Sequence, residues 1–184
     1  MPERLYFTGD DAADILLATN PLALLIGFAL DQQVTVPTAF LGPRKLEQRL
    51  GGLDAAAIAG MDAGDLEAAF REKPAVHRFP GNMARRVQEL CATIVSEYGG
   101  DASRVWTDAA DDADLRRRIE SLPGFGEMKV KALGSVLAKQ YGVPAAQGLV
   151  PNHPTLGDVD SPEALERYQA AKRAHKAKMR AQAT

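Results

Sequence analysis

The chain has 184 residues, of which 46% are hydrophobic and 25% charged, a composition typical of globular proteins. The net charge of −2 argues against a broad basic surface, and the length allows one domain or two small lobes that share a core. The longest apolar run, Leu22 to Leu30, is too short to span a bilayer, and the N-terminus lacks the pattern of a signal peptide. We therefore expect a cytoplasmic protein without a membrane partner.

Two helices are predicted near the N-terminus. The first, over residues 10–19, starts at polar capping residues and stops at Thr19. Asn20 then caps a second helix with Pro21 at its first position. Apolar side chains point all round this second helix, so it should be the buried centre of the body. It ends in Asp31-Gln32-Gln33, three polar residues that mark a surface or a cleft.

The middle of the chain continues as helices. A helix restarts at Thr35 and is expected to kink or break at Gly42-Pro43. Short helices follow from Asp54 and Asp62. The loop of residues 73–81 should connect to an amphipathic helix over residues 82–98, with Phe79 tucked into the core. Because no stretch alternates like a strand, we predict an all-α fold.

The cysteine and histidine content does not favour a metal site. Cys91 is the single cysteine and lies in phase with the apolar face of the 82–98 helix, so we expect a buried thiol. His77, His153 and His175 are scattered, without companions at ligand spacing.

A tight hairpin at residues 121–126 separates the predicted helix 111–120 from a helix ending near Tyr141. Gly124 and Gly126 permit positive φ and close backbone approach. The unpaired amides that begin the second helix can hold a phosphate, with Lys129 and Lys131 as counter-charges. An ordinary helix–helix corner is the alternative interpretation of a glycine-rich turn.

The string Leu122-Pro123-Gly124-Phe125-Gly126, with Gly142 near the end of the next helix, resembles the helix-hairpin-helix of the endonuclease III and 3-methyladenine glycosylase superfamily. Residues 20–35 resemble its first barrel helix. The resemblance covers residues 20–143 and implies the two-lobed, all-α HhH-GPD fold, with the hairpin at 111–141. Residues 1–184 would form one unit in which a loop and basic helix, 144–184, pack with the N-terminal helix.

The resemblance implies binding of double-stranded DNA, and a hairpin of this kind grips the backbone without reading sequence. We expect a monomer. The residues expected to grip the DNA backbone are Leu122, Gly124, Gly126, Lys129 and Lys131. Gln33 matches the glutamine that fills the gap left by a flipped base. The candidates for the base pocket, or for the wedge that enters the duplex, are Asp31, Gln32, His77, Arg78 and Phe79.

The chain departs from the family pattern in its chemistry. One cysteine excludes the family's four-cysteine iron–sulfur cluster, so no cofactor is expected beyond a monovalent cation at the hairpin carbonyls. The family's Schiff-base lysine aligns with Met128. Lys129, one position later, lies about 100° round the helix and is expected to face elsewhere. The resemblance therefore implies a monofunctional glycosylase, without lyase activity.

The family's aspartate, which follows the hairpin's second helix, is also missing, because residues 145–150 contain no carboxylate. Asp158 and Asp160 come some ten residues late and are the candidates for a relocated catalytic acid. Asp160 or Ser161 precedes a helix beginning at Pro162, so Asp160 as a plain N-cap is the alternative.

The last 24 residues are basic. Residues 161–184 contain six basic and two acidic side chains, which gives this segment a net charge of +4. Because the whole chain has a net charge of −2, residues 1–160 carry −6. Such a tail can bind phosphate, or it can be a solvated helix. Three functions therefore compete: a monofunctional DNA glycosylase, a non-catalytic DNA-binding or damage-recognition protein, and a helical protein-interaction adaptor.

Overall fold

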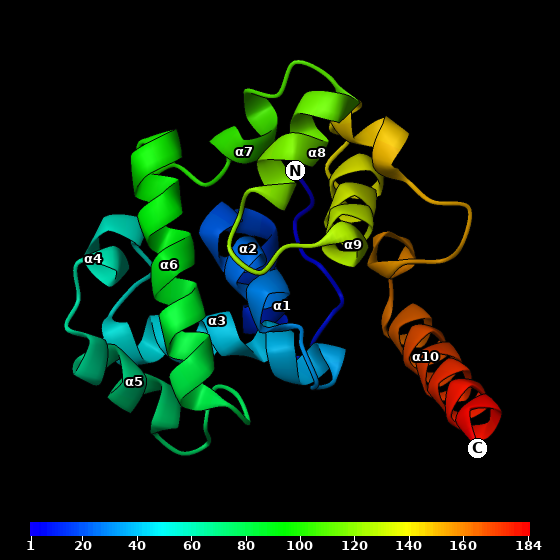
Figure 1. Ribbon diagram of the computed structural model, residues 1–184, viewed down its shortest axis with the longest axis horizontal. Coiled ribbons are helices and arrows are strands. Elements are labelled where there is room, and N and C mark those ends of the chain that lie inside the picture. The colour runs from blue at the N-terminus through cyan, green and yellow to red at the C-terminus, as the bar shows by residue number, and fades with distance from the viewer.

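The computed structural model describes residues 1–184 and contains helices but no strands, which confirms the all-α prediction (Figure 1). The α-helices are α1 Asp11–Thr19, α2 Pro21–Leu30, α3 Val36–Leu50, α4 Ala55–Ala59, α5 Ala63–Arg71, α6 Pro80–Tyr98, α7 Arg104–Thr107, α8 Asp112–Glu120, α9 Glu127–Lys139 and α10 Pro162–Ala183. Two short 3-10 helices, η1 Pro144–Leu149 and η2 Leu156–Asp158, lie between α9 and α10.

Helix α2 forms the centre of the molecule, as predicted. Its residues from Leu22 to Leu30 are all buried, and it packs against α1, α3 and α6. The Asn20 side chain accepts from the Leu22 and Ala23 N–H groups at 3.0 and 3.2 Å. A helix that is apolar on all sides is stable only inside a core. The packing of α2 therefore also fixes the position of Asp31, the polar residue at its end.

The remaining helices surround α2 in two groups. Helices α4 and α5 pack on α6, whereas η1 and η2 pack on α9 (Figure 1). One hydrophobic cluster runs through both groups, from Leu5 to Leu165. Helix α10 projects away at the lower right of Figure 1, and only Ala164 and Leu165 on it are buried. Helix α10 is therefore docked at its start and exposed toward its end.

Two local expectations differ from the structure, and one open alternative is decided by it. Helix α3 runs unbroken through Gly42-Pro43, and the lack of a side chain on Gly42 leaves room for Leu30, whose Cδ1 would lie 2.4 Å from a Cβ there. Phe79 is not tucked into the core but is 38% exposed. Of the two predicted caps for α10, Ser161 is the one used: its hydroxyl accepts from the Ala164 N–H at 3.1 Å, whereas Asp160 does not cap the helix.

The structure contains no group of three His, Cys, Asp or Glu side chains placed to hold a metal ion. Cys91 is buried, as predicted, and burial raises the pKa of its thiol to about 12. No single helix is both long and apolar enough to cross a membrane; α1 and α2 meet those criteria only as a pair bent by 112°.

Gly157 provides a test of the packing between α9 and η2, the short helix that directly precedes α10. A Cβ at this position would lie 2.6 Å from the Ser135 carbonyl carbon and oxygen. We expect Gly157→Ala to lower the free energy of unfolding by about 2–3 kcal/mol, because backbone cannot move aside cheaply. Gly126→Ala is the matched control, since a Cβ there has no neighbour within 4 Å. Equal urea midpoints for the two variants would contradict this packing.

Candidate nucleic-acid interface

The hairpin between α8 and α9 is anchored by buried apolar side chains. Leu122 is 2% exposed and Phe125 is 4% exposed. The Phe125 N–H donates to the Leu122 carbonyl over 3.1 Å. The Leu122 side chain therefore holds the hairpin from inside the core, and only its backbone can take part in the predicted DNA contact.

The two hairpin glycines have different conformations. Gly124 has φ +79°, in the region that favours glycine, as expected. Gly126 has φ −99° and ψ −168°, an extended conformation open to any residue, so the expectation of positive φ was wrong there. Because a Cβ on Gly126 would touch nothing within 4 Å, this glycine leaves open space beside the start of α9.

The start of α9 has the features of an anion site. Gly126 is its N-cap and supplies no side chain to its first N–H groups, which therefore remain free for a phosphate. Glu127 lies in the same turn and pairs with Arg116 at 2.6 Å and with Lys131 at 3.8 Å. The predicted counter-charge of Lys131 is thus partly neutralised by Glu127.

Lys129 lies against the end of α2, in a different direction from the exposed Met128. Its Nζ reaches the Ala29 carbonyl at 3.5 Å and lies 5.4 Å from the Phe125 ring centroid. Burial lowers the pKa of Lys129 to about 8, although Asp31 acts in the opposite direction. Met128, at the position of the family's lysine, is 85% exposed. Lys129 therefore joins α9 to the carboxyl end of α2, where a cation is favoured by the helix dipole.

Arg86 of α6 makes a second link between the same elements. Its Nη1 donates to Gln32 Oε1 at 2.8 Å, and its Nε lies 2.8 Å from where a Cβ on Gly124 would be. The end of α2, the first half of helix α6 and the hairpin therefore meet at one place. The sequence alone does not identify Arg86 as a site residue, because it shows Arg86 only as one polar residue of an amphipathic helix.

Gln33 has an unusual backbone at this junction. It is the only non-glycine residue with positive φ, at 58°, and its side chain is exposed. Gln33 lines two neighbouring grooves, one shared with Phe79 and Arg86 and the other with helix α10. A strained, exposed residue between two grooves is typical of a functional site.

His77 holds the loop before α6 in place and is not part of an open pocket. Its ring is 2% exposed. The Phe79 N–H donates to Nδ1 at 3.0 Å, so the proton lies on Nε2, which points to the Leu30 and Gln32 carbonyls at 3.1 and 3.0 Å. Burial lowers the pKa of His77, and the neutral ring is a fixed link between this loop and α2.

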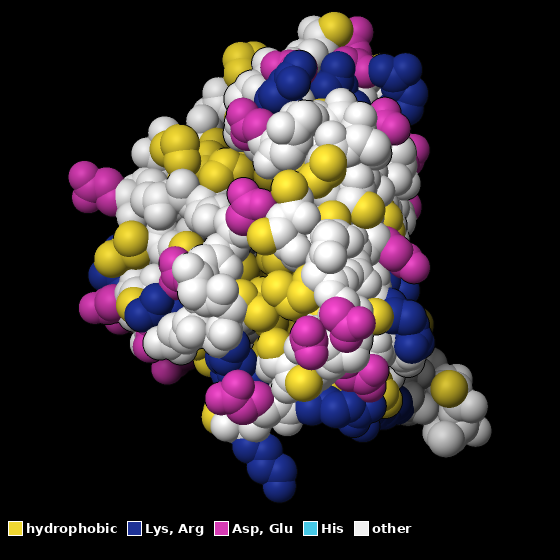
Figure 2. All heavy atoms as spheres, turned by 90° about the vertical axis from the view of Figure 1, so that its left-hand side faces the viewer, with side chains coloured by type: hydrophobic (Ala, Val, Ile, Leu, Met, Phe, Trp, Pro, Cys, Tyr) yellow, Lys and Arg dark blue, Asp and Glu magenta, His cyan; other side chains and the backbone are white.

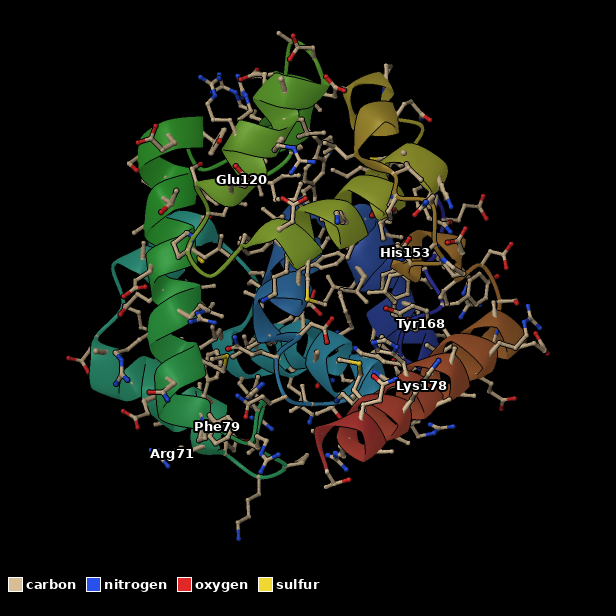
Figure 3. All side chains as sticks on the ribbon, turned by 45° about the vertical axis from the view of Figure 1, so that its right-hand side comes forward. Arg71, Phe79, Glu120, His153, Tyr168 and Lys178 are labelled. Carbon is tan, nitrogen blue, oxygen red and sulfur yellow. The ribbon has the colours of Figure 1, made fainter.

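Arg78 and Phe79, by contrast, lie at the surface. The guanidinium of Arg78 is 5.0 Å from the centroid of the Phe79 ring. Figure 3 shows Phe79 at the lower edge of the molecule, beyond the end of α5. An exposed aromatic ring beside Gln33 has the position that a wedge needs.

The structure places Asp31 beside this junction, as the C-cap of α2. Its side chain is half-buried, and it makes no hydrogen bond or ion pair with the protein. Burial raises the pKa of Asp31, whereas Lys172, Lys129 and Lys176 act to lower it. The site thus contains a carboxylate that no protein group neutralises by contact.

Residues 26–184 match the HhH-GPD superfamily of base excision DNA repair proteins. The chain belongs to this superfamily. The match includes residues 144–184, which the resemblance in the sequence analysis left uncovered. No curated protein and no solved structure matches the chain. As an HhH-GPD protein, it is a DNA-binding protein of the base excision repair class.

The two aspartates predicted for catalysis in this HhH-GPD chain have different surroundings. Asp158 accepts from the Thr155 N–H at 2.9 Å and pairs with Lys139. Burial acts to raise the pKa of Asp158, but these hydrogen bonds outweigh it and hold the pKa below its usual value. Asp160 is exposed, and no contact fixes its side chain. Neither aspartate lines the grooves around Gln33.

Helix α10 supplies one wall of a basic groove opposite the Gln33 loop. The groove has a volume of about 420 Å³ and is lined by Gln33, Val34, Thr35, Val36, Arg78, Gln169, Lys172, Arg173, Lys176 and Arg180. No acidic residue lines it. On the face in Figure 2, in contrast, Lys and Arg are interspersed with Asp and Glu. This groove, which we call the α10 groove, is therefore lined by positive charge without an acidic neighbour in its lining.

Proposed function

We propose that this HhH-GPD protein is a monofunctional DNA glycosylase that acts on a damaged base turned out of the duplex. The observation that carries the proposal is the convergence of the hairpin, exposed Gln33 and unneutralised Asp31 at the end of α2. The hairpin would hold backbone phosphate, Gln33 would fill the vacated stack, and a carboxylate would stabilise charge on the sugar.

Phe79 and the α10 groove support the same proposal. A protein that flips a base must offset the cost of unstacking with contacts in the opened duplex. An exposed aromatic ring can enter the stack, and a basic groove can follow the displaced backbone. A non-catalytic DNA-binding protein would use the hairpin and the groove but would have no need of an unpaired carboxylate.

The direct test is base release from duplexes that each carry one alkylated or deaminated base, under single-turnover conditions. We expect free base and an intact abasic strand from at least one of these duplexes. Binding of the whole panel without release of any base would favour the non-catalytic alternative. Failure to bind duplex DNA would favour an adaptor role.

Sodium borohydride should trap no covalent adduct between the protein and abasic DNA at pH 7. Met128 cannot form a Schiff base, and with a pKa of about 8 Lys129 is mostly protonated at pH 7 and held at the Ala29 carbonyl. Gel analysis of the reduced mixture checks this expectation. An adduct that Lys129→Ala abolishes and Lys131→Ala retains would show that the protein is bifunctional.

A further inference from the structure

Asp31 imposes a cost that the fold does not offset. Another acid, Asp14, is buried at 2% exposure, and its Oδ1 accepts from the Phe7 N–H, the Thr8 N–H and the Thr8 hydroxyl at 2.9–3.1 Å. Asp31 has no such donors. A half-buried carboxylate without a partner is destabilising, so its presence is not explained by folding.

The position of Asp31 on its helix adds to this cost. As the C-cap of α2, it lies at the negative end of the helix dipole, where an anion is unfavourable. Asp31 is also two residues from Gln33, the exposed residue with a strained backbone. A strained backbone and an unpaired charge both lower stability, and proteins keep such features mainly at functional sites.

Cationic and phenolic groups from two other helices face Asp31. Burial raises the pKa of Asp31, and Lys172 and Lys176 of α10 and Lys129 of α9 act against that rise, but none of them forms an ion pair with it. Burial raises the pKa of Tyr168 on α10, and Asp31 raises it further. The three lysines act in favour of the ionised carboxylate but do not pair with it. Its oxygens therefore remain free for a cation that arrives with a ligand.

We propose that Asp31 is the catalytic carboxylate of this protein, contacting the sugar of the flipped nucleotide. This inference rests on the proposed glycosylase function and replaces Asp158 and Asp160 in that role. Asp158 already accepts a hydrogen bond from the Thr155 N–H and pairs with Lys139. No hydrogen bond or ion pair fixes the side chain of Asp160. The carboxylate comes from the end of the central helix and not from the segment after the hairpin.

In this step the bond between C1′ of the sugar and the base nitrogen breaks, and its electron pair leaves with the base. The ionised Asp31 carboxylate stabilises the positive charge that develops on the sugar ring. A water oxygen then bonds to C1′, and its proton passes to Asp31 and on to the departing base or to solvent. The products are the free base and an abasic sugar.

The test compares Asp31→Asn with Asp158→Asn and Asp160→Asn in the full chain. Asp31→Asn should reduce single-turnover base release on the order of 100-fold. Its duplex affinity should stay within about threefold, and its melting temperature should not fall, because no hydrogen bond is lost and an unpaired charge is removed. The other two variants should release base at nearly the wild-type rate. Wild-type release by Asp31→Asn, or loss of release in Asp158→Asn or Asp160→Asn, would overturn the assignment.

A binding measurement tests Asp31 separately from turnover. The probes are two duplexes, one with a neutral tetrahydrofuran abasic site and one with a cationic pyrrolidine in its place. Wild type should bind the cationic duplex on the order of tenfold or more tightly, as expected for a transition-state mimic. Asp31→Asn should bind both equally. A wild type without this preference contradicts the inference, whereas a preference without base release supports Asp31 and contradicts the proposed activity on that panel.

Discussion

Replacing Arg173, Lys176 and Arg180 together with glutamine should flatten the salt dependence of duplex binding by about 2 to 3 units of slope. Each phosphate contact releases counterions and contributes about 0.9 to the slope of log K against log salt for duplex DNA. All three residues line the α10 groove, where no acidic residue neutralises them. Titration of one duplex at several salt concentrations gives the slope directly.

The control for this experiment is the double variant Arg167→Gln and Lys178→Gln. Both residues belong to α10 but lie outside the groove, so net charge falls while the groove is unchanged. Figure 3 shows Lys178 on α10, where the helix is exposed, so substitution there should not disturb packing. We expect the control to change the slope by less than about one unit. A triple variant with the wild-type slope would mean that the α10 groove does not bind DNA.

Helix positions and caps were predictable because they depend on local chemistry. Asn20, Thr35 and Ser161 each accept a hydrogen bond from a first-turn N–H group, as side chains of these types do at many helix starts. The burial of α2 followed from apolar residues on all its faces. These features need only a few neighbouring residues to be recognised.

The site was less predictable because its contacts join residues far apart in the chain. Helical geometry correctly separates Lys129 from Met128 but does not say which of them faces α2. Only the packing of α9 brings Lys129 to Ala29, and only the placement of α6 brings Arg86 to Gln32. The sequence shows Asp31 as a polar residue at the end of an apolar helix. Only the folded chain shows that its carboxylate has no partner.

Phe79 and His77 illustrate the same limit within one loop. The hydrophobic pattern predicted that Phe79 is buried and left His77 as a candidate for the base pocket or the wedge. The structure reverses them, because the His77 ring can bond the carbonyls of Leu30 and Gln32 and a phenylalanine ring cannot. The carbonyls at the end of α2 therefore determine which side chain of the loop is buried.

Substituting Gly126 with leucine should weaken duplex binding by about tenfold or more for every sequence tested, without lowering the melting temperature. The extended backbone at Gly126 accepts a side chain, and a Cβ there meets nothing within 4 Å. A leucine would instead fill the space beside the first amides of α9, where a phosphate would approach. Equal losses across sequences are expected because backbone contacts carry no sequence information.

Gly124→Val separates this occlusion from damage to the hairpin itself. At φ +79° a β-branched residue is strained, and its Cβ would displace Arg86 from above the hairpin. We therefore expect Gly124→Val to lose both melting temperature and affinity, and Gly126→Leu to lose affinity alone. Gly126→Ala, whose side chain is too short to cover the amides, should bind almost as wild type does. If Gly126→Leu also binds as tightly as wild type, the amides of α9 do not hold phosphate, and duplex binding depends on the α10 groove.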